Sequence, residues 1–210
     1  MTSQQVRRDF DSAAASWDQK ERRVKLAHAV SDAIICEAHP DSSMRALDFG
    51  CGTGLVTLLL APLVREIVAA DSSRGMLEQL TCKLKDSGIT NVTPFPLPHD
   101  GLGELPPTFD LVVSSMTMHH IADVGGLIKT FQATLSPGGQ LCIADLATED
   151  GSFHDDPTGI EHHGFSNQEM ERLFCEAGFS NVRTVRVMDV EKQRGTDIQK
   201  YRVNLTTGRR

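Results

Sequence analysis

Hydrophobic residues recur at intervals of three or four positions between Gln19 and Ala38, with polar residues between them. This spacing is that of one buried face of an α-helix. The apolar positions are Val24, Ala27, Val30, Ile34, Ile35 and Ala38. The pattern predicts an amphipathic helix that ends before Pro40.

After Pro40, short and nearly continuous apolar runs alternate with stretches of helical periodicity. The strand-like runs are residues 45–50, 66–71, 91–97, 109–116 and 138–146, and the helical stretches are residues 55–64, 74–85 and 125–135. This alternation is typical of repeated βαβ units. Parallel strands covered by helices on both faces require continuous apolar sequence, so we expect an α/β fold with a largely parallel sheet.

Capping residues support these helix boundaries. Ser72 or Ser73 can cap the start of the helix over residues 74–85, and Gly88 can end it in a left-handed turn. Ser166 followed by Glu169 is a capping box, which predicts a further helix closed by a glycine at position 178.

The C-terminal part of the chain has a different pattern. Residues 181–190 and 198–205 alternate apolar and polar positions on either side of a turn, which predicts an antiparallel pair of strands. Residues 147–165 are rich in Asp, Gly and His and show no period. A loop of that length in a compact domain is usually functional.

Composition narrows the class of protein. With 210 residues, 40% of them hydrophobic, we expect one domain over residues 1–210. The apolar runs are shorter than the roughly 20 residues of a membrane span, and the first residues are polar, which predicts a cytoplasmic protein without a membrane span. Five widely spaced cysteines fit reduced thiols in a cytosol. A formal net charge of −7 without a basic stripe gives no expectation of nucleic-acid binding.

Three glycines follow the first predicted strand, in the stretch LDFGCGTG. Gly50, Gly52 and Gly54 lie at the carboxyl end of that strand, where open parallel sheets bind ligands. Glycines allow left-handed backbone conformations and let backbone N–H groups approach a ligand at the start of the next helix. Asp71 ends the second strand, where a carboxylate can accept hydrogen bonds from a ribose diol. The combination predicts an adenosine-type site.

The spacing of the loop bears on the type of ligand. A dinucleotide fingerprint is G-x-G-x-x-G, whereas this loop is G-x-G-x-G with Asp48 just before it. A buried acid beside the loop would repel phosphate and attract an ammonium group. This favours an adenosyl amino acid over a dinucleotide.

Four motifs together resemble a known family. The stretches LDFGCGTG, VAADSS, FDLVVSSMTMHHI and LSPGGQLCIAD are similar, in order and spacing, to class I S-adenosylmethionine-dependent methyltransferases. The similarity is to the small-molecule branch related to quinone-biosynthesis and type 11 methyltransferases, and it runs from about Phe10 to Val182. It implies a Rossmann-like sheet of seven strands with one antiparallel strand, and S-adenosyl-L-methionine as cofactor.

The resemblance also implies roles for particular residues. It places Asp48 and residues 50–54 around the methionine part of the cofactor, and Asp71 at the ribose hydroxyls. The cofactor-binding residues expected in this way are Asp48, Gly50, Cys51, Gly52, Gly54, Asp71, Ser72, Met76, Asp100, Ser115 and Met116. Asp100 is the candidate for the adenine amino group, with His99 as the alternative. Cys51 is interpreted as a small side chain facing the sheet rather than as a nucleophile.

Methyl transfer needs alignment of two reactants more than it needs a particular catalytic residue. If the acceptor carries a proton, a histidine within hydrogen-bond reach can serve as general base. The candidates are His119, His120 and His163, each of which could equally be a structural residue. No ligand spacing predicts a metal site, so none is expected.

The acceptor pocket is expected between an N-terminal cap over residues 1–40 and the loop over residues 147–165. Trp17 could line this pocket or be packed in the core. The pairs Arg7–Arg8 and Arg22–Arg23 are interpreted as solvated helix faces, with contact to an acidic acceptor as the alternative. The acceptor is expected to be a small molecule.

Two other functions remain open from the sequence. One is a module that binds S-adenosylmethionine and regulates a partner without turnover. The other is a nicotinamide oxidoreductase, which is disfavoured by the loop spacing and by the lack of a catalytic Tyr/Lys pair, because the only tyrosine, Tyr201, falls in the last predicted strand.

Overall fold

A seven-stranded sheet forms the centre of the protein, in the order β3-β2-β1-β4-β5-β7-β6. The structure is a computed structural model that describes residues 9–98 and 108–210. The strands are β1 Arg45–Phe49, β2 Glu66–Asp71, β3 Val92–Pro96, β4 Phe109–Ser115, β5 Leu135–Leu146, β6 Ser180–Arg194 and β7 Asp197–Arg209. Only β7 runs antiparallel to its neighbours, β5 and β6. The predicted Rossmann-like fold with one antiparallel strand is confirmed.

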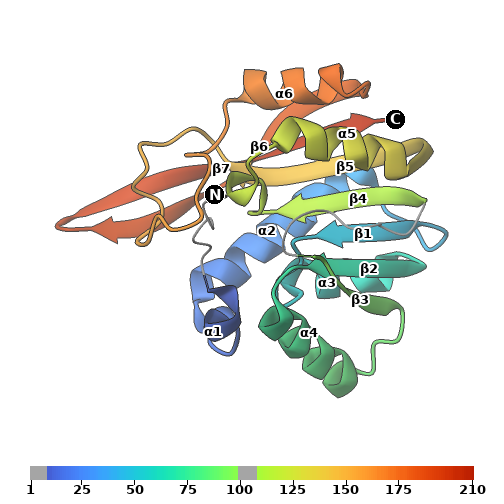
Figure 1. Cartoon of the computed structure of the whole chain (residues 1–210), viewed down its shortest axis with the longest axis horizontal. Helices are drawn as coiled ribbons and strands as arrows, with labels where there is room; N and C mark the ends of the chain where they lie inside the picture. Colours follow the sequence, from blue (N-terminus) through green and yellow to red (C-terminus); the bar gives the residue numbers. More distant parts are fainter. Residues whose placement is uncertain (1–8, 99–107) are drawn as a thin grey trace, which may run out of the picture.

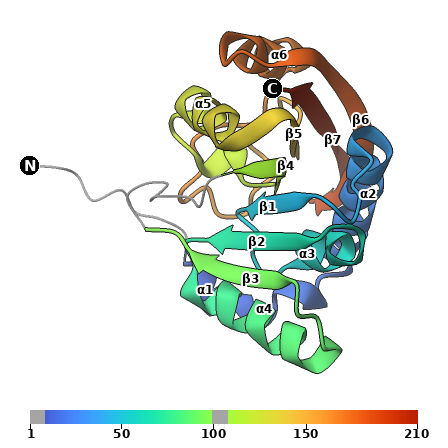
Figure 2. The same ribbon diagram turned by 90° about the vertical axis from the view of Figure 1, so that its right-hand side faces the viewer.

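Helices cover both faces of the sheet (Figures 1 and 2). The α-helices are α1 Phe10–Ala14, α2 Glu21–Ala38, α3 Leu55–Leu60, α4 Arg74–Ser87, α5 Val124–Thr134 and α6 Asn167–Glu176, and the 3-10 helices are η1 Trp17–Gln19, η2 Ala61–Leu63 and η3 Met118–His120. One hydrophobic cluster joins α2, α3 and α4 to one face, and a second joins α5 and α6 to the other. Because β1, β2 and β4 contribute alternate residues to the two clusters, their sequences are mostly apolar rather than alternating.

The predicted helix boundaries are borne out by capping contacts. The Ser73 hydroxyl accepts from the backbone N–H of Met76, and the Ser166 hydroxyl accepts from that of Glu169. Gly88 closes α4 with a φ of 65°. β5 begins at Leu135, before the apolar run over residues 138–146, and its pairing with β4 is irregular between Phe109 and Leu111.

The β6–β7 hairpin extends beyond the carboxyl end of β5. Leu146, the last residue of β5, pairs with Val203, so the part of the hairpin from Asp189 to Arg202 projects past the rest of the sheet (Figure 1). The strands β1 and β4 point toward the same edge. The hairpin therefore forms a side wall for anything bound there.

Residues 9–20, here called the cap segment, carry α1 and η1 and lie beside the same edge. Asp11 Oδ1 accepts hydrogen bonds from the Ser73 hydroxyl at 2.5 Å and from the Gly75 N–H at 2.8 Å. Asp18 accepts from the Thr53 hydroxyl at 2.6 Å and pairs with Lys83. The cap expected over residues 1–40 also includes α2, which packs into the hydrophobic core and contributes Arg22, Arg23, Leu26 and Ala27 to the cavity lining described below.

Candidate active site

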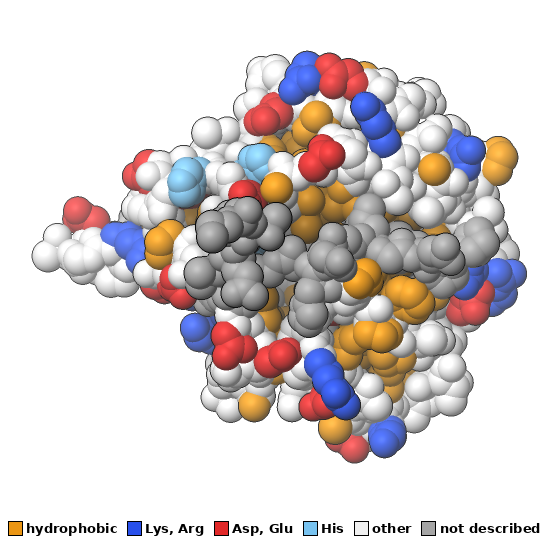
Figure 3. All heavy atoms as spheres, in the orientation of Figure 1, with side chains coloured by type: hydrophobic (Ala, Val, Ile, Leu, Met, Phe, Trp, Pro, Cys, Tyr) orange, Lys and Arg blue, Asp and Glu red, His pale blue; other side chains and the backbone are white. Residues whose placement is uncertain are grey.

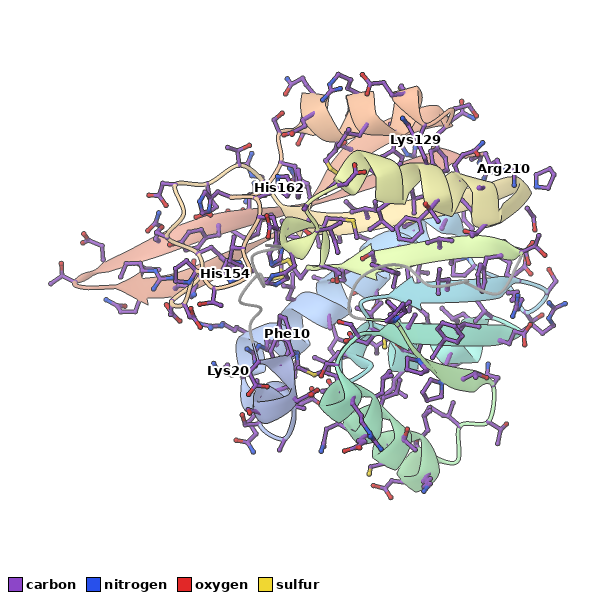
Figure 4. All side chains as sticks on the ribbon, in the orientation of Figure 1. Phe10, Lys20, Lys129, His154, His162 and Arg210 are labelled. Carbon is purple, nitrogen blue, oxygen red and sulfur yellow. The ribbon has the colours of Figure 1, made fainter. Side chains whose placement is uncertain are left out.

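A cavity of about 920 Å³ lies at the carboxyl ends of β1 and β4. Strand order reverses here, because β1 has β2 on one side and β4 on the other, and open α/β sheets bind ligands at such a point. The walls come from the cap segment, the glycine loop, the end of β4, η3, the loop after β5 and β6. Phe10, Lys20 and His154 mark this edge in Figure 4.

Most of the residues predicted from the sequence line this cavity. Those that do are Asp48, Gly50, Cys51, Gly52, Asp71, Ser72, Met76, Ser115, Met116, His119 and His120. Gly54 and His163 are not part of the lining. Asp100 and His99 lie outside the described residues.

The glycine loop takes the left-handed conformation that its sequence suggested. Gly50, Gly52 and Gly54 have φ values of 72°, 55° and 82°. A Cβ atom on Gly54 would lie 2.4 Å from Leu80 Cδ1, whereas one on Gly52 would meet only Met76 Sδ, at 4.0 Å. Gly54 therefore allows close packing against α4 and does not line the cavity, and its role as a cofactor contact stays a prediction.

Asp71 holds the glycine loop against the start of α4. Its Oδ2 accepts from the Gly52 N–H and its Oδ1 from the Ser73 N–H, both at 2.8 Å. Burial raises the pKa of Asp71 above its ordinary value, and these backbone hydrogen bonds oppose the shift. Each carboxylate oxygen keeps a second lone pair for a ligand.

Asp48 is a buried acid beneath the loop, with 1% of its surface exposed. Burial raises its pKa to about 7, while the hydrogen bond from the Thr57 hydroxyl, at 2.5 Å, lowers it and the charge of Asp71 raises it further. No lysine or arginine among the described residues forms an ion pair with Asp48. A positively charged group of a ligand would therefore stabilise its ionised form.

The raised pKa of Asp48 predicts a pH-dependent stability. Between about pH 4 and pH 7 the folded protein holds a proton that the unfolded chain releases, so this group lowers the free energy of unfolding as pH rises. Asp48→Asn keeps the acceptor for Thr57 and removes the charge. Without cofactor, the melting temperature of the variant should exceed that of the parent at pH 8 by about 5 °C more than it does at pH 5. A parent-to-variant difference that does not change with pH would contradict this assignment.

Histidine side chains gather at the other end of the cavity. His119, which is 1% exposed, places Nδ1 2.7 Å from Asp145 Oδ1, and His120 places Nδ1 2.7 Å from the Gly159 carbonyl oxygen. The ring of His154 lies 4.9 Å from that of His119, centroid to centroid. Because a carbonyl oxygen only accepts, His120 carries its proton on Nδ1, and Nε2 is the basic atom of the neutral ring.

Asp145 fixes the orientation of His119. Burial alone would raise the pKa of Asp145, but the charge and hydrogen bond of His119 and the backbone N–H groups of Leu146 and His119 lower it below its ordinary value. A carboxylate on Nδ1 leaves Nε2 as the basic ring atom of neutral His119. His119 and His120 both fit the role of a proton acceptor.

His163 does not belong to this group. Its side chain is 58% exposed, and its Nδ1 lies 3.6 Å from Glu149 Oε1. It does not line the cavity, so its position gives no support to the role of base, which stays a prediction.

Two features of the site were missed in the sequence. Met116 has a φ of 56°, a strained conformation for a non-glycine residue, where the chain leaves β4 beside the cavity. Val190 and Lys192 on β6 line the cavity although they lie far from every motif. The alternation of β6 puts these two residues on one face, which was the only available signal.

The described residues contain no group of three or more histidines, cysteines or acids that could hold a metal ion. Cys51 is buried, and burial followed by the charges of Asp48 and Asp71 raises the pKa of its thiol well above its ordinary value. A protonated thiol is a poor nucleophile, which supports the structural interpretation of Cys51. No helix in the described ranges is long and apolar enough to cross a membrane.

A glycine loop and an acid at the end of β2, set at the switch point of this sheet, define a class I S-adenosylmethionine-dependent methyltransferase. The chain belongs to the Methyltransferase domain family, whose model matches residues 19–184. The cosubstrate of this class is S-adenosyl-L-methionine.

Known proteins support this assignment. An uncharacterized methyltransferase of Schizosaccharomyces pombe is 35% identical over 159 residues, which are 69% of this chain and 56% of that protein. A ubiquinone biosynthesis O-methyltransferase of Rhizobium johnstonii is 28% identical over 152 residues, which are 65% of this chain and 61% of that protein. This chain therefore corresponds to only about three fifths of each relative. A solved methyltransferase from Aquifex aeolicus shares the fold, with a TM-score of 0.69, 19% identity and coverage of 95% of this chain and 97% of that one.

Proposed function

We propose that this protein transfers a methyl group from S-adenosyl-L-methionine to a small-molecule acceptor. The observation that carries the proposal is that one cavity joins Asp71 and the glycine loop to the histidines and aromatic residues at its far end. Such a cavity brings two reactants together, and its volume of about 920 Å³ lies in the range of small-molecule sites.

The residues at the loop end fit the cofactor. Asp48 supplies a buried negative charge for the ammonium group of the cofactor. Because Gly52 has no Cβ atom, the space beside it is left for a bound ligand. Asp71 would accept hydrogen bonds from the ribose hydroxyls, with Ser72 and Met76 beside the adenosine and Ser115 and Met116 beside the reactive end. When bound, the sulfonium supplies an electrophilic methyl carbon whose bond to sulfur breaks as the acceptor's lone pair attacks.

The other residues of the cavity align the acceptor and remove its proton. Phe10, Trp17 and Phe153 offer aromatic surface for an apolar body. A hydroxyl or ammonium acceptor must lose a proton during transfer, and Nε2 of His119 or His120 is the atom suited to take it. Alignment and exclusion of water supply most of the rate enhancement.

A small acceptor is favoured over a nucleic acid. The formal net charge is −7, and acidic and basic side chains are interspersed on the face seen in Figure 3. Such a surface gives no continuous positive stripe to a phosphate backbone on that face. The relatives named as ubiquinone biosynthesis O-methyltransferases point the same way.

Calorimetric titration with S-adenosyl-L-methionine and with NAD, followed by a screen of phenols, quinols and amines for release of S-adenosylhomocysteine, tests the proposal. The expected result is binding of S-adenosyl-L-methionine alone and turnover with at least one acceptor. Binding without turnover on any acceptor would favour a regulatory module. Binding of NAD instead would favour an oxidoreductase.

A further inference from the structure

Lys192 projects from the extended part of β6 into the acceptor end of the cavity. Only 6% of the residue is exposed, although it carries an ammonium group. Its Nζ donates to the Phe153 carbonyl oxygen and lies 3.5 Å from Asp155 Oδ1. An ammonium group has three donors, so these two acceptors leave capacity for a ligand.

The carboxylate beside Lys192 compensates its charge only in part. Asp155 Oδ1 also accepts from Arg194 Nη1, so two cations share one carboxylate oxygen. Burial lowers the pKa of Lys192, the charge of Asp155 opposes this, and the charges of Arg194 and Arg22 lower the pKa further. A buried cation with a shared counter-ion is stabilised by a further negative group.

Arg22, at the start of α2, lines the same cavity as Lys192, and its positive charge contributes to the lowered pKa of Lys192. Within residues 9–98 and 108–210, Arg22 forms no ion pair. Its guanidinium can hold both oxygens of a planar anion. The sequence interpretation of Arg22 as part of a solvated helix face thus accounts for only part of its environment.

Phe10, Trp17 and Phe153 line the same cavity as these two cations. The Lys192 ammonium lies 4.8 Å from the centroid of the Phe153 ring, and the guanidinium of Arg23 lies 3.4 Å from the Trp17 ring. Phe10 contacts Trp17 edge to face, with centroids 5.9 Å apart. The acceptor end therefore combines two cations with flat apolar surface.

We propose that Lys192 and Arg22 form an anion-binding subsite that selects a methyl acceptor with a carboxylate group on a flat, apolar body. This inference rests on the proposed function, because it concerns the acceptor of the same reaction. A single negative charge is favoured over the double charge of a phosphate, since Asp155 and Glu161 also line the cavity. The carboxylate of the acceptor would bind both Lys192 and Arg22. These two contacts would hold the methyl-accepting atom of the acceptor in one orientation.

Titration calorimetry on the protein saturated with S-adenosylhomocysteine tests the subsite. The probes are hydroxybenzoates and hydroxycinnamates, each paired with its neutral amide of the same size. At least one carboxylate should bind about tenfold or more tightly than its amide, because hydrogen bonds to charged groups are the strong ones. Lys192→Met and Arg22→Gln should each reduce this ratio to less than about threefold.

Matched variants outside the cavity control for general effects of charge. Lys200 and Arg202 are exposed residues of β7 that pair with Glu191 and Asp189. Lys200→Met and Arg202→Gln should keep the parental ratio. If Lys192→Met does not fold, the ratio of carboxylate to amide affinity measured for Arg22→Gln, at an exposed position, tests the subsite. Equal affinity for carboxylate and amide, binding of amides only, or no binding of any probe would overturn the inference. Failure to bind S-adenosylhomocysteine would instead overturn the proposed function, and the inference with it.

Discussion

Asp71→Ala is expected to lower the affinity for S-adenosyl-L-methionine by about a hundredfold or more. Each hydrogen bond from a ribose hydroxyl to the carboxylate contributes about 1.5–3 kcal/mol of binding free energy, and both are lost when the carboxylate is removed. The variant also frees the Gly52 and Ser73 N–H groups, which the carboxylate holds at 2.8 Å. Calorimetric titration with S-adenosyl-L-methionine measures the change.

The fold should survive this substitution. Burial raises the pKa of Asp71, so the ionised carboxylate costs free energy in the cofactor-free protein and its removal recovers part of that cost. Asp86→Ala, at an exposed position of α4, is the matched control and should leave affinity unchanged. Parental affinity in Asp71→Ala would remove Asp71 from the adenosine site.

Gly52→Ala should abolish cofactor binding at a small cost in stability. At a φ of 55° a side chain costs roughly 1–2 kcal/mol. Among the described residues the new Cβ atom would meet only Met76 Sδ, at 4.0 Å. The methyl group would instead occupy the space that we assign to the ligand. Melting curves and titrations of the same samples separate the two effects.

Gly88→Ala provides the matched control for this strain. Gly88 has a φ of 65° at the end of α4, and a Cβ atom there would meet nothing within 4 Å. Both variants should therefore melt at similar temperatures, and only Gly52→Ala should lose binding. If both bind the cofactor as the parent does, the ligand does not approach the loop at Gly52.

The arrangement of strands and helices was predictable because each element shows its own local pattern of apolar and polar residues. Continuous apolar runs mark strands buried on both faces, and alternation in residues 181–190 marks a strand with one exposed face. The serine caps and Gly88 depend on neighbours within a few residues, and these too were predicted correctly.

The cofactor end of the site was predictable for the same reason, whereas the acceptor end was not. Asp48, Gly52 and Asp71 follow from a strand, a turn and the next strand in immediate succession. Lys192 reaches the cavity because the β6–β7 hairpin extends past the end of β5. That extension depends on pairing between distant segments of the chain. Motif spacing also carries no side-chain direction, so it could not show that Gly54 faces Leu80.

The cap segment is held by polar contacts and buries little apolar surface. α1 buries only Ala14, and η1 buries no residue. Segments with few buried apolar contacts open locally at a much lower free energy than the core. We therefore expect the cap to open at a lower free energy than the sheet, so that reactants can exchange without global unfolding. Because Asp11 and Asp18 attach it to α4 and to Thr53 of the glycine loop, the residence time of the closed cap is tied to the conformation of that loop.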